Sequence, residues 1–196
     1  MSFYQDFPFL PDSNEGVLQE MKAKGETEKI EFRFSSAFDT NPPSAILTFD
    51  DIDFVTQTNL SENANFLSIK LKDRVVYTKG YIIRSRNHTA SFYLKSWDLF
   101  GSFTGNSWTL LHSVKEQNDL IRGKIGRYSI EGGPFKYFKI VQTGPCNGAV
   151  DANKYRLRIT YFDVFGFMTS GIYVLKKSCH CATTFSTFHL LIIIVG

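Results

Sequence analysis

The residue types best suited to binding a metal lie close together near the C-terminus, in the tripeptide Cys179-His180-Cys181. Thiolates and imidazoles are zinc ligands, but structural zinc sites space their paired cysteines by two to four residues and need a second pair. Cys146 is the one remaining cysteine of the sequence, and an odd total of three does not form a disulfide framework. The spacing therefore favours reduced thiols over a zinc site.

The histidines could act as acid–base catalysts only in a suitable setting. They are His88, His112, His180 and His189. None of them belongs to a nucleophile motif, and the sequence contains no glycine-rich phosphate loop. His112 follows the apolar pair Leu110-Leu111, which favours a place in a strand. We therefore expect no catalytic residues, and predict that the protein is not an enzyme.

Length and charge limit the classes of partner. A chain of 196 residues is long enough for one domain with extensions. Its net charge of +3 is small and its charged residues are interleaved, so we expect no nucleic acid partner. The N-terminus lacks the basic and apolar regions of a secretory signal, which predicts a cytoplasmic protein.

The apolar run from Phe185 to Val195 is shorter than the roughly 20 residues that a membrane-spanning helix needs. We therefore predict no transmembrane segment.

Period-2 alternation of apolar and polar residues recurs along the middle of the chain and predicts strands. Residues 115–126 are rich in charged and amide side chains and are expected to form a loop. About eight short strands with turns between them predict an antiparallel sandwich or barrel. The predicted strands include 30–35, 46–49, 67–71, 81–86, 97–100, a run opening at 108, 128–130, 137–141 and 155–165.

Both tryptophans lie in one predicted hairpin, Lys95 to Leu111. Trp97 and Leu99 alternate with Asp98 and Phe100, a turn with Gly101 and Gly105 follows, and Trp108 opens the second strand. Two large indole rings so close in sequence predict that Trp97 and Trp108 both anchor the core.

An aromatic leader precedes the strands. Its aromatic residues are Phe3, Tyr4, Phe7 and Phe9. We expect this segment to pack either on its own domain or on a neighbouring protein. A short helix then follows, with Val17, Leu18 and Met21 on one face, an N-cap at Asp12 or Ser13, and an end at Gly25.

Five motifs follow one another along the chain. They are Leu67–Leu71, Gly80–Ser85, Lys95-Ser96-Trp97 with Gly101-Ser102 and Trp108, then Tyr137–Gly144 and Tyr161–Gly166. Together they resemble the motifs of discoidin domains, also called coagulation-factor C-type domains, and the leader is similar to a segment found in intracellular protist members. The resemblance implies an antiparallel jelly-roll β-sandwich of the galactose-binding-like type over residues 29–166, with residues 1–28 as leader and 167–196 as an apolar extension.

The same resemblance implies two sites. Asp50, Asp51 and Asp53 occupy the loop where such domains often hold a structural calcium ion, for which hard carboxylate oxygens are suitable ligands. The usual Asp-Gly-Asp turn is absent, so a solvated acidic turn is the alternative. Ligand-binding loops at one end of the sandwich would contain Phe54, Arg86 and His88.

The function that we predict from these observations is a non-catalytic scaffold module in a larger cytoplasmic assembly of proteins, of flagellar or cytoskeletal type. The alternative is a lectin-like module that binds carbohydrate or lipid. The scaffold hypothesis assigns partner binding to the apolar ends of the chain, at Phe3, Tyr4, Phe7, Phe9, Phe185 and Phe188.

Overall fold

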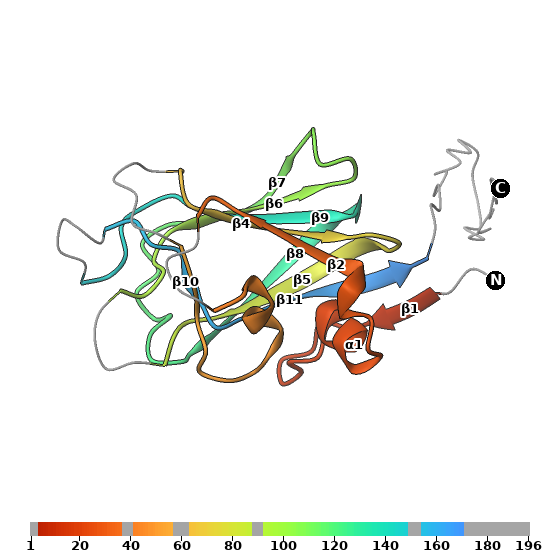
Figure 1. Ribbon diagram of the computed structural model, residues 1–196, viewed down its shortest axis with the longest axis horizontal. Helices are drawn as coiled ribbons and strands as arrows, with labels where there is room; N and C mark the ends of the chain where they lie inside the picture. The colour runs from red at the N-terminus through yellow and green to blue at the C-terminus, as the bar shows by residue number, and fades with distance from the viewer. Residues whose placement is uncertain (1–3, 37–40, 57–62, 88–91, 149–153, 171–196) are drawn as a thin grey trace, which may run out of the picture.

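The computed structural model describes residues 4–36, 41–56, 63–87, 92–148 and 154–170. Two antiparallel sheets face each other across one core (Figure 1), which confirms the predicted β-sandwich. The four-stranded sheet has the order β1-β11-β5-β8, the five-stranded sheet has the order β2-β4-β9-β6-β7, and β10 pairs with β3. The elements are β1 (Tyr4–Phe7), α1 (Val17–Ala23), η1 (Thr27–Lys29), β2 (Ile30–Phe34), η2 (Pro43–Leu47), β3 (Phe54–Val55), β4 (Phe66–Leu71), β5 (Val75–Arg84), β6 (Trp97–Ser102), β7 (Thr109–Val114), β8 (Ile125–Phe135), β9 (Tyr137–Gln142), β10 (Arg158–Ile159) and β11 (Tyr161–Thr169).

The five-stranded sheet follows the alternation of its sequence. In β4, Leu67, Ile69 and Leu71 are buried in the core, whereas Lys70 lies on the outer face. Ile69 pairs with Phe138 of β9, which is also buried. One face of this sheet therefore packs on the core and the other is left to polar and half-buried side chains.

The four-stranded sheet is apolar on both faces. Phe162 and Val164 of β11 point into the main core. Tyr161 and Phe165, on the opposite face of the same strand, form a second buried cluster with Ile82 of β5. A strand covered on both sides needs apolar residues on both faces, and β11 supplies them on either side of the buried Asp163.

The leader covers the outer face of this sheet. β1 pairs with β11 at the sheet edge, and the Phe9 ring packs edge-on against Phe165, with 5.4 Å between ring centroids. Gly80 makes room for it, because a Cβ there would lie 2.5 Å from Phe9. The leader thus packs on its own domain, the first of the two predicted alternatives, and β11 continues past the predicted boundary at Gly166.

Asp163 of β11 fixes the helix that follows the leader. Its carboxylate is fully buried and accepts hydrogen bonds from the backbone N–H groups of Gly16, Leu18 and Gln19, at 2.9, 2.8 and 3.1 Å. The predicted N-caps at Asp12 and Ser13 are wrong, because α1 begins at Val17 and its free N–H groups meet Asp163. The predicted apolar face of Val17, Leu18 and Met21 is buried.

Two strand predictions are wrong. The segment predicted as a strand at residues 46–49 overlaps the 3₁₀ helix η2, which begins at Pro43, where the fixed φ of proline suits a helical first turn. The strand predicted at 155–165 is divided into β10 and β11.

The two tryptophans have different environments. Trp97 is fully buried, and its Nε1 donates to the Tyr81 hydroxyl at 3.0 Å. The same hydroxyl lies 2.9 Å from Nδ1 of His112, in β7, so the strand predicted for this histidine is confirmed. The predicted core position of Trp108 is wrong, because the ring is half-exposed under the Lys139 ammonium, 4.2 Å from the ring centroid.

We expect Asp163→Ala to lower the free energy of unfolding by about 3 kcal/mol, because it leaves buried N–H groups at the start of α1 without an acceptor. Urea unfolding measures this change. The matched control is Asp12→Ala, which removes an exposed carboxylate from the predicted cap and should change stability by less than about 0.5 kcal/mol. Equal losses in both variants would show that the Asp163 contacts do not hold the leader helix.

The pH dependence of stability should also reveal Asp163. Burial raises the pKa of its carboxyl from 3.8 to about 7, and the N–H donors oppose this rise only in part. The folded state therefore holds this proton more tightly than the unfolded state, and the resulting stabilisation is complete below pH 3.8 and is lost as the pH rises through about 7.

We expect the free energy of unfolding of the wild type to fall, relative to Asp163→Asn, as the pH rises from about 5 to about 8. Urea titrations at each pH measure it, and parallel pH profiles for the two proteins would contradict the raised pKa.

Candidate functional site

Several loops meet at one end of the sandwich, the end at which β10 lies, opposite β1 and α1 (Figure 1). Arg84, the last residue of β5, pairs with Tyr161 at the start of β11 and with Ile125 at the start of β8. The loop that follows β5 therefore lies beside the loops that precede β8 and β11, and the Arg84 side chain also reaches the loop before β3. These loops are far apart in the sequence, and the pairing of strands in the sheet brings them together.

Arg84 contacts two loop segments, the one before β8 and the one before β3. Its Nε donates to the carbonyl oxygen of Gly123 at 3.1 Å, and its Nη1 donates to the carbonyl oxygen of Asp50. Its Nη2 forms an ion pair with Oδ1 of Asp51 at 2.9 Å. Because only 12% of the arginine side chain is exposed, these contacts position the acidic loop firmly.

An exposed group of side chains surrounds this arginine. The Phe49 ring is 47% exposed, packs edge-on against Tyr161 at 5.0 Å, and has the Arg84 guanidinium carbon 4.9 Å from its centroid. Oδ2 of Asp51 accepts a hydrogen bond from Asn87 at 3.1 Å, and the bonds from Asn87 and Arg84 lower the pKa of Asp51. We call Phe49, Asp51, Arg84 and Asn87 the loop-end site.

The loop-end site combines an apolar ring with fixed polar groups. Phe49 offers a surface for the C–H groups of a ligand, and the ionised Asp51 offers hydrogen-bond acceptors beside the Asn87 amide. Small-molecule sites commonly pair an aromatic surface with a few oriented polar groups in this way.

A second polar group lies directly beside it. Nε of Arg86 is 3.4 Å from Oδ2 of Asp53, and each of these side chains is 17% exposed. Arg158 of β10 approaches from the neighbouring strand, because β10 pairs with β3, which begins one residue after Asp53. Its guanidinium carbon lies 5.3 Å from the centroid of Phe92.

The predicted loop residues have three different outcomes. Arg86 does lie at this end of the sandwich, in the group just described. Phe54 is fully buried in β3 and packs against Phe34, so its predicted role in ligand contact is wrong. His88 lies outside the described residues.

The acidic cluster is not brought together as one ligand set. Oδ1 of Asp50 accepts the backbone N–H of Ile52 at 2.9 Å, whereas Asp51 pairs with Arg84 and Asp53 pairs with Arg86. Within the described ranges, no three Asp, Glu, His or Cys side chains are grouped so that they could hold a metal ion. The carboxylates that were predicted as calcium ligands bind arginines and backbone instead.

The predicted partner-binding residues of the leader are mostly occupied within the domain. Phe7 is buried and Phe9 packs on Phe165, so neither presents a free ring, and the predicted role of these two residues is wrong. Tyr4 is exposed, although its ring stacks on Phe167 at 5.6 Å.

Phe3, Phe185, Phe188 and the Cys179-His180-Cys181 tripeptide lie outside the described residues. In the part of the chain that is described, no helix is long and apolar enough to cross a membrane.

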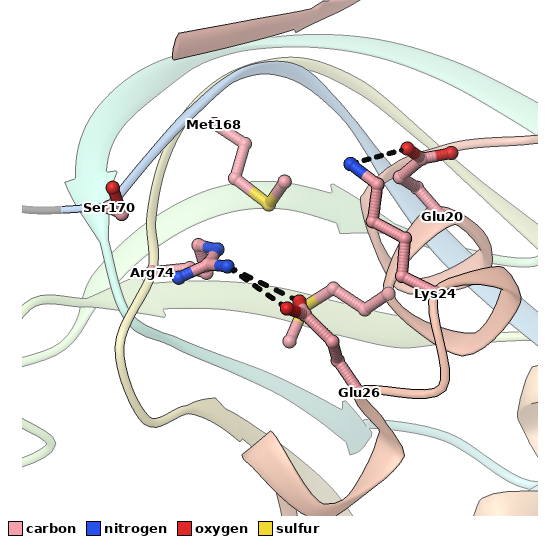
Figure 2. Close-up of a pocket in the computed structure, with 7 residues that line it drawn as sticks. Glu20, Lys24, Glu26, Arg74, Met168 and Ser170 are labelled. Atoms are coloured by element: carbon pink, nitrogen blue, oxygen red, sulfur yellow. Dashed lines mark hydrogen bonds and ion pairs between the residues drawn. The ribbon is translucent and has the colours of Figure 1, made fainter. Parts of the chain in front are cut away.

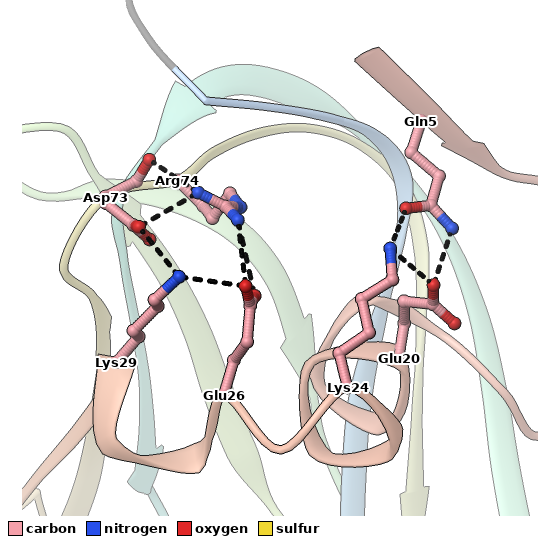
Figure 3. A network of polar contacts seen from close by, with 7 residues as sticks. All are labelled: Gln5, Glu20, Lys24, Glu26, Lys29, Asp73 and Arg74. Atoms are coloured by element: carbon pink, nitrogen blue, oxygen red, sulfur yellow. Dashed lines mark hydrogen bonds and ion pairs between the residues drawn. The ribbon is translucent and has the colours of Figure 1, made fainter. Parts of the chain in front are cut away.

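A hollow of about 330 Å³ lies at the opposite end, between α1 and the end of β11 (Figure 2). Arg74 there pairs with Glu26 at 3.3 Å and with Asp73 at 2.9 Å, while Lys24 pairs with Glu20 at 2.8 Å (Figure 3). Since these charges pair with one another, the hollow presents no unmatched charge to a ligand.

Sequence reasoning missed Phe49, Arg84 and Asn87. Phe49 directly precedes the acidic cluster, so an aromatic residue beside acidic turn residues was an available signal. Arg84 and Asn87 carried none, because the residues that they bind lie more than 30 positions away.

A calcium titration tests whether Asp50, Asp51 and Asp53, two of which pair with arginines, can still bind a metal ion. We expect the melting temperature to be the same in a few millimolar calcium as in the same concentration of magnesium, since a ligand stabilises a fold only if it binds the folded state. Thermal unfolding in the two salts is the measurement. A rise specific to calcium, lost in Asp51→Asn, would restore the predicted metal site.

No protein-family model matches the chain, and no curated protein matches it. Solved structures do. A CBM32 domain from Clostridium perfringens, solved in complex with GalNAc-β-1,3-galactose, is 9% identical with a TM-score of 0.56, over 71% of this chain and 97% of that one. A second CBM32 domain, from a family 31 glycoside hydrolase of the same organism, is 13% identical with a TM-score of 0.58, over 71% and 92%.

An F5/8 type C domain from Bacteroides fragilis is 16% identical to this chain, with a TM-score of 0.53, over 71% of this chain and 93% of that one. At these identities the likeness is one of fold. It agrees with the sheet order and with the motifs that resemble discoidin domains. The chain therefore has the discoidin-like, galactose-binding-like jelly-roll fold that CBM32 and F5/8 type C domains share.

Proposed function

We propose that this protein is a non-catalytic carbohydrate-binding module, and that the loop-end site binds the sugar. The observation that carries the proposal is the exposed Phe49 ring beside the fixed polar groups of Asp51 and Asn87. Similar structures were solved with sugars, among them a family 32 CBM of Clostridium perfringens in complex with galactose, 12% identical with a TM-score of 0.53.

The chemistry of the site suits a sugar. One face of a pyranose ring is a patch of C–H groups that can pack on Phe49, while the hydroxyls at its edge can donate to the Asp51 carboxylate. Arg84 holds that carboxylate before any ligand arrives, so little ordering remains when a sugar binds. The Asn87 amide adds a donor and an acceptor next to it.

The scaffold hypothesis has less support. Two of the leader's aromatic residues, Phe7 and Phe9, pack inside the domain, although Tyr4 of the same segment is exposed. The similar structures reported above are sugar-binding modules or domains of the same fold, and none is described as part of a flagellar or cytoskeletal assembly.

No site in the described part of the chain supports catalysis. Its one described histidine, His112, lies in β7 with its Nδ1 against the Tyr81 hydroxyl, and burial lowers its pKa. It faces the core network, away from the loop-end site.

A glycan array of neutral and acidic sugars, followed by calorimetric titration with the best ligand, tests the proposal. We expect Phe49→Ala to weaken binding at least tenfold, because the ring surface under the sugar is lost, with a smaller effect on the melting temperature. Phe103→Ala is the matched control, since this half-exposed phenylalanine lies in the hairpin turn at the other end and should leave affinity unchanged.

Two results would overturn the proposal. One is an array on which the folded protein retains no glycan. The other is a bound glycan whose affinity is the same for Phe49→Ala and the wild type, which would place binding elsewhere on the domain.

A further inference from the structure

Two ion pairs lie in succession at the loop end. Asp51 forms an ion pair with Arg84. Asp53, two residues further along its segment, forms an ion pair with Arg86, two residues after Arg84. Arg158 lies near the second of these pairs, close enough for the charges of Arg86 and Asp53 to act on it. It has no ion pair with any carboxylate among the described residues, whereas the carboxylates of Asp51 and Asp53 are already engaged.

The charges beside Arg158 are therefore unbalanced. Asp53 is the carboxylate whose charge acts on its guanidinium, and Asp53 is paired with Arg86. Burial and the nearby charge of Arg86 lower the pKa of Arg158, and Asp53 compensates only in part. Two guanidinium groups with one carboxylate leave a net positive charge in a half-buried position, where an anion is held more strongly than in water.

Buried polar atoms in the same place lack hydrogen-bond partners among the described residues. They are Nε of Arg86, Nε of Arg158 and Oδ2 of Asp53. A small movement could join Arg86 to Asp53, which is 3.4 Å away, but Arg158 has no comparable neighbour among the described carboxylates. A buried N–H without a partner is destabilising, so the Nε of Arg158 points to an acceptor that the described residues do not supply.

The backbone around Arg158 also has an unusual feature. Phe92, which lies under the guanidinium, has φ of +82°. A bulky residue rarely adopts this conformation, and such strain occurs preferentially at binding sites. The ring packs against the guanidinium, with 5.3 Å between the guanidinium carbon and the ring centroid.

We propose that Arg86 and Arg158 form an anion subsite beside the loop-end site, and that it binds the carboxylate or sulfate group of an acidic sugar. The inference rests on the proposed function and specifies its ligand class: a sugar ring lies on Phe49, and its acidic substituent reaches the two guanidinium groups. Planar guanidinium groups bind carboxylate and sulfate oxygens through paired hydrogen bonds, which neutral hydroxyls cannot match.

The anion subsite can be tested without any sugar. Thermal unfolding is measured in sodium sulfate and in sodium chloride at equal ionic strength. We expect sulfate to raise the melting temperature of the wild type above its value in chloride, because it binds the folded state at the two arginines. Arg158→Gln should lose this difference. Arg33→Gln, which removes an exposed arginine of β2, should retain it.

The sugar is then tested by calorimetric titration with galacturonate, galactose 6-sulfate and galactose. We expect at least one acidic sugar to bind about tenfold more tightly than galactose, and Arg158→Gln to abolish that preference while galactose binding is unchanged. Arg158→Lys keeps the charge without the planar fork and should retain only part of the preference, which separates a binding role from an effect on folding.

The outcomes distinguish the two proposals. If galactose binds at Phe49 while acidic sugars bind no more tightly, the anion subsite is wrong and the proposed function stands. If sulfate stabilises the protein through Arg158 while no sugar binds, the anion subsite stands and the carbohydrate function is wrong. If sulfate and chloride act alike and Arg158→Gln changes nothing, the subsite is rejected.

Discussion

The buried carboxylate of Asp163 is the contact on which the rest of the structure depends. It accepts the first N–H groups of α1 across 145 positions of sequence and so fastens the leader to β11. The neighbouring Tyr161 hydroxyl donates to the carbonyl oxygen of Asn14 and lies 3.3 Å from Asp163, and the Tyr161 ring supports Phe49. One buried carboxyl group therefore connects the position of the leader with the shape of the loop-end site.

Local periodicity predicted much of the sandwich. The alternation in β2, β4, β6 and β9 is visible within a few residues, because each of these strands has one face on the core and one outside. Among the predictions that failed are those for the N-cap of α1 and for the segment after Pro43. The cap of α1 comes from Asp163, and the segment after Pro43 forms a 3₁₀ helix although its apolar residues also suit a strand.

The candidate site was predicted in its location but not in its chemistry. The acidic cluster was recognised, yet sequence alone does not tell carboxylates that surround a metal from carboxylates that pair with arginines on other strands. Asp51 and Asp53 meet Arg84 and Arg86 only because the segment before β3 lies against the end of β5 and the residues that follow it. Likewise Phe49 and Phe54 flank the same cluster, and only packing decides that the first is exposed and the second buried.

The pairing of β1 with β11 has a consequence for biosynthesis. The first described strand of the chain hydrogen-bonds only to the last, so it has no partner while the ribosome is still making the middle of the protein. The outer cluster around Phe165 likewise stays uncovered until both ends of the domain are available. Completion of this sheet must therefore follow translation of nearly the whole domain, and a nascent chain that stalls before β11 would expose aromatic side chains to the cell's chaperones.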